Sequence, residues 1–302
     1  MKKILVIYYT QTGQIRTILD SIISGFTDMS MVEIDYAEIK PSKPYPYPWK
    51  EAFYNSFPES VKGIPCQLES WDFDLNKEYD LVLLGMQVWY LSPSIPASSF
   101  LQHPEIKIFL RGKNVVTVNG VRNMWYTSYL LCKKYLGDAG AHYQGNIVMY
   151  DRTDNYIAGI TVIAWMVHGK KKLALFPQSG VSDEDILNAK TYGQIIYSNL
   201  IENTLSKLQE ALVFAGAVKV KFHLMKIEIV ARKIFVKFAD FVLKKGSYES
   251  PLRKTRVALF KYYLLFVFFI LSPFVSIFQM LRRWVFYSSA NKQIRIFQGL
   301  KP

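Results

Sequence analysis

Cysteine and histidine are scarce in this sequence of 302 residues, which argues against a fold framed by disulfides or metals. The two cysteines, Cys66 and Cys132, lie far apart with no motif around them. They fit a reducing compartment, and we expect no structural disulfide. The four histidines have no spacing typical of metal ligands and form no protease-like triad, so we expect no metal site. They are His103, His142, His168 and His223.

Glycine-rich phosphate signatures are absent from the sequence as well. The loop after the first apolar run has too few glycines for the dinucleotide fingerprint and lacks the lysine of a P-loop. No internal repeat or low-complexity segment is present. The chain enters a predicted strand within its first residues, so we expect no secretory signal peptide.

Acidic residues are rare in the C-terminal part of the chain. Residues 217–302 contain 17 lysines and arginines against 3 acidic residues, whereas residues 1–216 contain 20 basic and 21 acidic residues. The net charge of +13 is therefore located in the tail. This asymmetry predicts a near-neutral domain, 1–215, and a basic tail, 217–302, that meets an anionic surface.

The N-terminal segment predicts a site for an anion. Residues 4–9 form a short apolar run typical of a strand buried on both faces. Residues 10–14 then supply hydroxyls, an amide and one glycine, and residues 15–23 take up helical spacing. The free N–H groups and positive dipole end of such a helix favour a phosphate. A strand-turn-helix without any ligand is the alternative.

Apolar runs alternate with helical segments and predict an α/β fold with a doubly wound, five-stranded parallel sheet. Four prolines within residues 41–48 exclude helix and central strand there, so the aromatic segment 41–76 is expected to be a lid or an edge-covering insertion. The other four strands are expected at 31–38, 79–85, 114–119 and 145–150. Helices are expected at 49–56, 97–110, 124–136, 156–167 and 182–214.

Two further loops follow strands at the edge where open α/β sheets bind ligands. Residues 85–96 offer Trp89 and Tyr90 as flat faces for stacking. Residues 119–128 contain Gly120, which permits close approach of the backbone to a ligand. The alternative for the aromatic side chains is ordinary interface packing.

Three side chains are candidates for catalysis. Arg122 would stabilise negative charge, with a surface salt bridge as the alternative. Tyr126 and His142 are the candidate bases. His142 is included because it precedes the fifth predicted strand, on a loop that we expect at the active edge.

The tail contains an amphipathic helix and an uncharged apolar segment. Apolar residues recur with helical spacing over 227–242, and most basic residues lie off that stripe, as in helices on anionic lipid. Residues 262–281 are long enough to span a bilayer and have basic flanks, Arg282 and Arg283 on one side. Pro273 allows instead a hairpin within one leaflet. The alternative without a membrane is a core helix hairpin or a dimer interface.

The first loop resembles the phosphate loop of flavodoxin-like proteins, which bind FMN through a Thr/Ser-x-Thr-Gly-x-Thr segment. Ile15 stands where that pattern has its last threonine. The resemblance implies a flavodoxin-like fold with FMN as cofactor, whose reduced N1/O2 edge Arg122 and backbone N–H groups would stabilise. The implied cofactor-binding residues are Thr10, Gln11, Thr12, Gly13, Gln14, Ile15, Gln87, Val88, Trp89, Tyr90, Asn119, Gly120, Val121, Arg122, Met124 and Trp125.

A closer resemblance, over most of the chain, is to the dialkylresorcinol condensing enzyme family, flavodoxin-like proteins of flexirubin and aryl-polyene pigment clusters. Residues 2–14, 44–49, 57–60 and 119–125 carry it. The resemblance implies a flavin-dependent oxidoreductase that aromatises an alkylated cyclohexanedione to a dialkylresorcinol. A separate ketosynthase-like partner would first join the acyl units, because this chain has no thiolase-like Cys/His/His site.

The product would partition into a membrane, so we expect the tail to hold the protein at the cytoplasmic face of the inner membrane. Its partner is then a lipid surface and not nucleic acid. The rivals are a membrane-docked electron carrier or quinone reductase without its own lipid substrate, and a scaffold that binds no flavin. The insertion at 41–76 favours the enzyme, because a carrier needs an exposed flavin edge.

Overall fold

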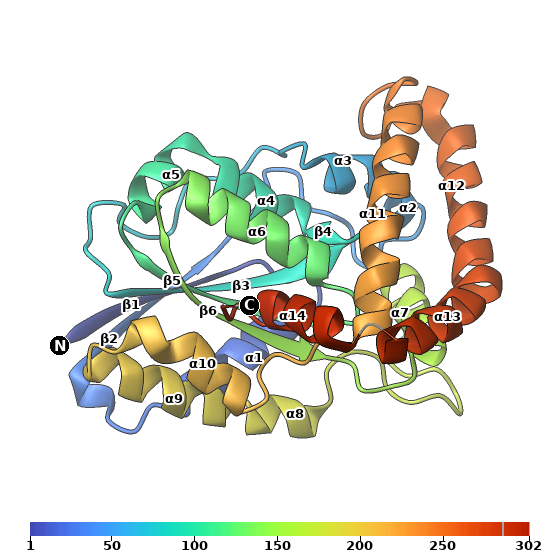
Figure 1. Ribbon diagram of the computed structural model, residues 1–302. Helices are drawn as coiled ribbons and strands as arrows, with labels where there is room; N and C mark the ends of the chain where they lie inside the picture. Colours follow the sequence, from blue (N-terminus) through green and yellow to red (C-terminus); the bar gives the residue numbers. More distant parts are fainter. Residues whose placement is uncertain (286, 302) are drawn as a thin grey trace.

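The fold is built on a parallel sheet. The computed structural model describes residues 1–285 and 287–301. Five strands run parallel in the order β2-β1-β3-β5-β6, and β4 pairs antiparallel with β3 (Figure 1). The strands are β1 (Lys2–Tyr8), β2 (Val32–Glu38), β3 (Leu81–Trp89), β4 (Ser92–Pro93), β5 (Asn114–Val121) and β6 (His142–Tyr150).

The predicted doubly wound α/β class is confirmed, with one correction. The sheet has six strands where five were predicted, because residues 92–93 turn back onto β3 as the short β4. A strand of this length is too short to show a hydrophobic period in the sequence. The order of the parallel strands is that of the flavodoxin-like fold, in which the ligand edge lies at the carboxyl ends of β1 and β3.

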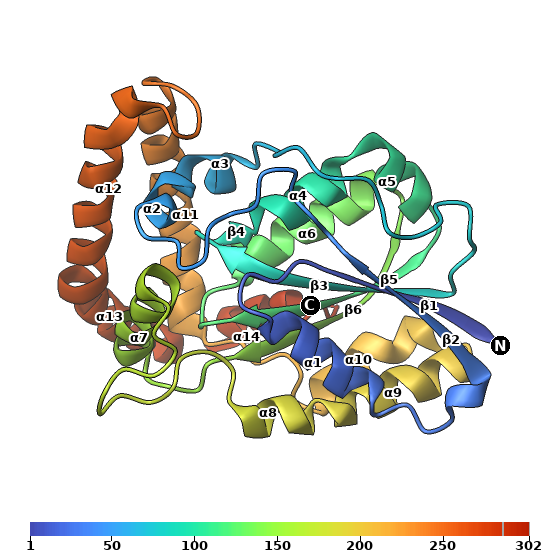
Figure 2. The same ribbon diagram turned by 180° about the vertical axis from the view of Figure 1, so that it is seen from behind.

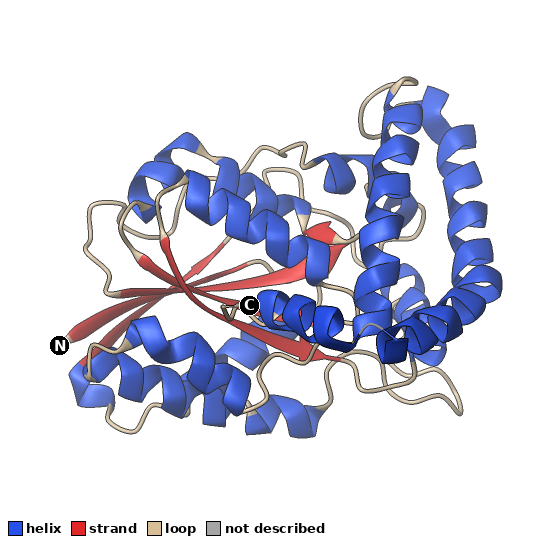
Figure 3. Ribbon diagram, in the orientation of Figure 1, coloured by secondary structure: helices blue, strands red, loops and turns tan. Residues whose placement is uncertain are grey.

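Helices cover both faces of the sheet (Figure 3), and each layer buries its own apolar cluster. The helix predicted over 182–214 is divided into shorter helices, and Asn203 with φ 58° follows the end of α9. The helix predicted over 97–110 is interrupted at His103, which precedes Pro104. One layer contains α1 (Gln14–Ile23), α8 (Asp183–Asn188), α9 (Lys190–Ile201) and α10 (Leu208–Phe214); the other contains α4 (Ile95–Gln102), α5 (Pro104–Leu110) and α6 (Tyr126–Asp138).

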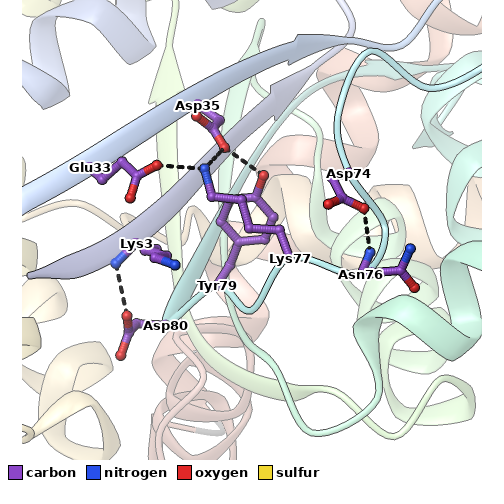
Figure 4. Close-up of polar contacts among 8 residues, drawn as sticks. All are labelled: Lys3, Glu33, Asp35, Asp74, Asn76, Lys77, Tyr79 and Asp80. Carbon is purple, nitrogen blue, oxygen red and sulfur yellow. Dashed lines mark hydrogen bonds and ion pairs between the residues drawn. The ribbon is translucent and has the colours of Figure 1, made fainter.

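A polar cluster lies at the amino-terminal edge of the sheet (Figure 4). Lys77 Nζ donates to Glu33 Oε1 at 2.7 Å and to Asp35 Oδ2 at 2.5 Å, and the Tyr79 hydroxyl donates to Asp35 at 2.6 Å. These hydrogen bonds lower the pKa of Asp35. Side chains of this edge are thus engaged with one another, at the opposite end of the strands from the predicted ligand edge.

The insertion and the tail form a second group of helices beside the carboxyl edge (Figures 1 and 2). The insertion holds α2 (Ala52–Asn55) and α3 (Phe57–Lys62), where Pro58 in the first turn starts a helix and does not end one. Next to them stands α7 (Asn155–His168), which was predicted. The tail comprises α11 (Phe222–Leu243), α12 (Lys254–Phe266), the π-helical turn η4 (Val267–Leu271), α13 (Ser272–Val285) and α14 (Tyr287–Phe297).

The tail packs on the sheet domain. Phe222, Met225, Ala290 and Phe297 belong to the same buried cluster as α1 and β1. The ring of Phe297 lies 5.7 Å from that of Tyr126 on α6. The helix predicted over 227–242 is confirmed as part of α11, while its role on lipid and independent folding of residues 1–215 stay predictions.

Some of the basic residues expected to face lipid turn inward instead. Arg232 Nη1 donates to Ser92 Oγ at 2.6 Å, and Lys226 Nζ donates to Gln293 Oε1. Directly before α12, Arg253 is fully buried and forms a bidentate ion pair with Glu59, at 2.6 and 2.8 Å. Arg232 and Arg253 hold the tail onto the domain, and Lys226 joins α11 to α14 within the tail, so only part of the tail's positive charge is available to an anionic surface. Arg282 and Arg283, the predicted C-terminal flank, have side chains outside the described part.

Glu228 fixes α11 to the start of α6. Its Oε1 accepts a hydrogen bond from the Thr127 backbone N–H at 2.6 Å and lies 2.8 Å from the Thr127 hydroxyl oxygen. The side chain is fully buried, and Oε2 has no partner within the described chain. Burial raises the pKa of Glu228 to about 7, against the opposing effect of the hydrogen bonds from α6. The carboxyl therefore keeps its proton in the folded protein to a higher pH than in the unfolded chain.

We expect the free energy of unfolding to fall as pH rises from 4.5, the ordinary glutamate value, to about 7. In this window the unfolded chain ionises Glu228 while the folded chain keeps it protonated, at about 1.4 kcal/mol for each unit of pKa difference. Glu228→Gln removes this component, and Glu249→Gln, an exposed carboxylate, serves as the control. Urea unfolding at several pH values measures all three proteins. A wild-type slope shared by Glu228→Gln would contradict the assignment.

Candidate functional site

A cavity of about 420 Å³ lies at the carboxyl ends of β1, β3 and β5. This is the point where the strand order reverses, since β2 lies on one side of β1 and β3 on the other. Ten of the sixteen predicted cofactor-binding residues line it. They are Thr12, Gln14, Gln87, Val88, Trp89, Tyr90, Gly120, Val121, Arg122 and Met124.

The loop between β1 and α1 has the geometry of an anion site. Gly13 adopts φ 81°, a conformation that favours glycine, and no side chain caps the helix that follows it. The first N–H groups of α1 therefore have no partner within the helix. Thr10 Oγ1 is also buried without a hydrogen-bond partner in the described structure. Uncapped donors and an unused hydroxyl on one short loop suit a phosphate group.

The two glutamines of this loop hold neighbouring segments in place. Gln14 makes two hydrogen bonds of 3.1 Å to the backbone of Val181. Gln11 Nε2 donates to the carbonyl oxygens of Tyr45 and Pro46, each at 3.1 Å. The loop is thereby tied to the insertion on one side and to the segment before α8 on the other.

The turn from β3 into β4 is a strained hairpin at the cavity wall. Tyr90 and Leu91 have φ of 47° and 65° between the paired residues Trp89 and Ser92, as in a type I′ turn. Asn and Gly usually occupy such positions, so bulky residues here carry strain. The turn is held by hydrogen bonds to its carbonyl oxygens, from Ser60 Oγ to Trp89 at 2.8 Å and from Thr127 Oγ1 to Leu91 at 2.6 Å. The hairpin thus presents Trp89 and Tyr90 on a fixed support.

Aromatic rings of the insertion, and of Tyr9 after β1, surround Trp89. Its ring centroid lies 4.4 Å from that of Trp49, 5.2 Å from that of Tyr45 and 5.6 Å from that of Tyr9, all edge to face. Trp49 lines the cavity, and its indole N–H is buried with no acceptor in the described chain. The insertion therefore covers this edge of the sheet, one of the two roles predicted for it, and brings a buried indole N–H without an acceptor in the described chain close to the cavity.

Arg122 places a desolvated cation in the cavity. Its Nη1 donates to the Asn155 carbonyl at 3.3 Å, and its guanidinium lies 4.7 Å from the ring centroid of Phe268 in η4. Surrounding protein lowers the pKa of Arg122 to about 10, partly offset by the charge of Asp151. The predicted alternative, a surface salt bridge, does not occur, since no carboxylate of the described chain lies within 4 Å. A guanidinium in this state favours an anion in the cavity.

Two of the predicted catalytic side chains lie elsewhere. His142 is the first residue of β6, and its backbone N–H donates to the carbonyl oxygen of Lys113, beside the start of β5. The prediction that His142 lies at the active edge is therefore wrong. A residue that precedes a strand lies at the amino end of a parallel sheet. Tyr126 is buried in the core, where its hydroxyl accepts from the Lys221 N–H at 2.9 Å. Tyr126 is not among the residues that line the cavity.

The remaining predicted residues outside the lining have structural contacts. Ile15 packs against the sheet, where a Cβ on Gly120 would lie 2.9 Å from its Cδ1. Gly120 is thus required for helix packing as well as lining the cavity. Asn119 donates to Asn146 Oδ1 at 2.9 Å, and Trp125 packs 4.7 Å from the Tyr126 ring.

The other half of the cavity is apolar and was missed by sequence reasoning. It is formed by α7 and by the tail, elements that were expected to be a buried helix and a separate anchor. Their helical spacing was visible in the sequence, but no pattern shows which partner an apolar stripe will face. The apolar lining includes Val162, Ile163, Ile227, Val230, Ala231, Ile234, Leu264, Val267, Phe268, Leu271 and Val275.

Gly159 on α7 allows Phe268 to approach Arg122. A Cβ at this position would lie 2.4 Å from Phe268 Cε1 and 2.9 Å from Arg122 Nη1. We expect Gly159→Ala to destabilise the protein by about 1–3 kcal/mol through overpacking. Gly137→Ala, on α6 with open space around it, should stabilise by about 1 kcal/mol.

Urea unfolding of the single variants and of Gly159→Ala combined with Phe268→Ala measures the contact. The combined variant should lose less stability than the sum of the two single changes, because the smaller side chain relieves the clash. Equal effects of Gly159→Ala and Gly137→Ala would contradict the observed packing.

Comparisons with known proteins find likeness only among solved structures, at low sequence identity. No family model and no curated protein matches the chain. Solved structures that resemble it include a flavoprotein in complex with FMN from Lactobacillus acidophilus (20% identity, 49% of this chain and 93% of that chain, TM-score 0.39). A flavodoxin from the domain Archaea (13%, 66% and 99%, TM-score 0.38) and RosB with a bound flavin-phosphate intermediate (12%, 73% and 92%, TM-score 0.34) are further examples. With all these TM-scores below 0.5, the flavodoxin-like topology rests on the strand order itself.

Proposed function

We propose that this protein is an FMN-dependent oxidoreductase that aromatises an alkylated cyclohexanedione to a dialkylresorcinol. The observation that carries the proposal is the convergence of an uncapped helix N-terminus, an aromatic wall and a desolvated arginine on one cavity at the switch point. Each feature alone has a structural explanation. Together they suit the phosphate, ring and charge of a flavin mononucleotide.

The residues present fit FMN. The loop from Thr10 to Gln14 would hold the phosphate, because Thr10 Oγ1 has no hydrogen-bond partner in the described chain and Gly13 provides no side-chain cap for the first N–H groups of α1. Trp49, Trp89 and Tyr90 would meet the ring from the cavity wall. When bound, FMN supplies a two-electron acceptor for hydride.

The chain's own contribution to the reaction is binding, charge stabilisation and exclusion of water. Aromatisation removes one hydride and one proton from the cyclohexanedione ring, and the carbonyl oxygens carry negative charge as the proton leaves. Arg122 is a fixed cation in a desolvated wall, where its field acts on such charge more strongly than in water. The aromatic insertion and the tail close the cavity around the reacting ring. No role as a base is proposed for Tyr126 or His142.

We also propose that the protein acts at the cytoplasmic face of the inner membrane, beside a ketosynthase-like partner that supplies the dione. One helical segment of the described chain, Pro251–Leu281, has the length and composition to cross a membrane. It contains 31 residues, and its most apolar window has a mean hydropathy of 2.3 with 6% of its residues buried. The bend at η4, just before Pro273, and the inward side chains of α13 favour docking in one leaflet over a straight span (Figure 1).

The second candidate is an electron carrier or quinone reductase without a lipid substrate. It is favoured by the strand order, which simple flavodoxins share. The covered cavity weighs against it, since a carrier exchanges electrons through an exposed flavin edge. The apolar half of the cavity has no purpose in a carrier.

The phosphate loop is tested by paired glycine substitutions. Gly13 and Gly112 both have positive φ, at 81° and 72°, with open space where a Cβ would lie. Gly13→Val and Gly112→Val should therefore carry similar backbone strain, but Gly13→Val alone should lose FMN, because its side chain crowds the phosphate position. Flavin released on denaturation measures retention. Equal affinity of the wild type for riboflavin and FMN would contradict the phosphate assignment.

The reaction is tested anaerobically. Oxidised protein mixed with a 2,5-dialkylcyclohexane-1,3-dione should lose its visible flavin absorbance while an equal amount of dialkylresorcinol appears. Arg122→Gln should slow the bleaching by about 10²-fold or more, as loss of one preorganised charge-stabilising group does. A flavin that stays oxidised with the dione but exchanges electrons with a reductase would replace the enzyme with the carrier. Resorcinol formation at the same rate without flavin would remove the chemistry from this protein.

A further inference from the structure

The cavity extends from the loops at the carboxyl ends of the strands to side chains of α7 and the tail. Beyond Arg122 its walls are mostly apolar side chains of three separate elements, α7, α11 and the α12–α13 segment, with Lys226, Ser272 and Gln279 as the polar side chains among them. Contacts across this part hold the elements together, as when the Tyr156 ring lies 5.6 Å from that of Phe268 and the Ser272 hydroxyl meets that of Tyr156 at 3.3 Å. Figure 2 shows α7 beside α13 in this region. Such a wall suits a hydrocarbon chain.

A charged group marks the inner end of this apolar space. The Arg122 guanidinium lies against Phe268, one face of the apolar wall, and has the lowered pKa of a cation taken out of water. Trp49 adds a buried N–H without an acceptor in the described structure. Buried donors and charges without such partners are costly, so a site that holds them beside an empty space favours an acidic group there.

The outer end of the space reaches an apolar surface. Val230, Ile234 and Leu271 line the cavity and are nevertheless 57%, 37% and 46% exposed. The outward side chains of α12 and α13 continue this surface, and Phe266, Phe274 and Phe278 are 57%, 70% and 61% exposed. An uncovered apolar face of this extent on a basic tail is suited to lipid.

We propose that this half of the cavity is a binding site for an acidic amphiphile that enters from a lipid bilayer. The ionised head is held by Arg122, and the alkyl chain lies between α7, α11 and the η4–α13 segment. The mouth between α11 and η4 faces the bilayer on which the exposed phenylalanines dock. The inference rests on the proposed function for its purpose, because the enolate of a cyclic dione with alkyl chains is such an amphiphile. It assigns the tail a role in substrate binding as well as in docking.

Tryptophan quenching by a brominated fatty acid tests the site without any reaction. Trp49, Trp89 and Trp165 line the cavity, so bromine on a bound chain quenches their fluorescence. We expect saturable quenching of the full chain by the acid, about tenfold tighter than by the brominated alcohol of equal length. Arg122→Gln should weaken binding of the acid by about tenfold and leave the alcohol unchanged. Equal affinity of wild type for acid and alcohol would overturn the role of Arg122.

Two phenylalanine substitutions test the chain path. Ala231→Phe fills the apolar wall and should weaken acid and alcohol alike, whereas Leu259→Phe, on an exposed position of α12 outside the cavity, should change neither. An unchanged affinity in Ala231→Phe would overturn the proposed path. Circular dichroism and urea unfolding of each variant show that the fold is kept.

The route from the bilayer is tested with vesicles of phosphatidylglycerol and phosphatidylcholine that carry the brominated acid. Phe274→Glu removes apolar surface outside the cavity and should abolish rapid quenching from vesicles, while binding of monomeric acid stays as in wild type. Unchanged transfer in Phe274→Glu would overturn uptake from the bilayer. Flavin is measured in the same samples by its visible absorbance. Absent quenching with flavin present would overturn this inference alone, and quenching with no bound flavin would overturn the proposed function.

Discussion

The close contact of α1 with the sheet is the constraint on which the rest of the site depends. Gly85 and Gly120 have no side chain, and a Cβ on either would lie within 2.9 Å of Ile15 or Leu19. The helix can therefore lie directly on the ends of β3 and β5, with its uncapped N-terminus at the point where strand order reverses. A side chain at Gly85 or Gly120 would push α1 away from the sheet, and with it the loop of residues 10–14 that precedes the helix.

The tail completes what the sheet domain begins. A flavodoxin-like sheet presents its ligand edge to solvent, and here α7, α11 and the α12–α13 segment close that edge with apolar side chains. Buried polar contacts hold the closure in register, with Glu228 at the first turn of α6 and Arg253 paired to Glu59. Apolar packing alone would specify the register less strictly. These contacts require that the carboxyl of Glu228 and the guanidinium of Arg253 be removed from water, which costs free energy of folding.

Arg122 lies where the two halves meet. Its charge belongs to the β5 loop, but the environment that lowers its pKa includes Phe268 from the tail and Asn155 from α7. Neither the domain nor the tail alone provides this desolvated cation. The proposed flavin and the proposed amphiphile would meet at the same group, which would give a physical reason for joining this tail to the sheet domain.

The sequence by itself determined the local structure of this protein. Period and composition predicted the five parallel strands, the phosphate loop after Tyr8, the α11 helix and the apolar segment that ends at Leu281, because these depend on neighbours a few residues apart. Only the tertiary structure decided which edge of the sheet each side chain lies at and which helices pack together. His142 stands at the amino edge, Tyr126 is buried behind Lys221, and α11 turns Arg232 and Glu228 inward. An apolar stripe shows that a helix must be covered but not by what, so the apolar half of the cavity, which the tail forms against the sheet domain, is visible only in the tertiary structure.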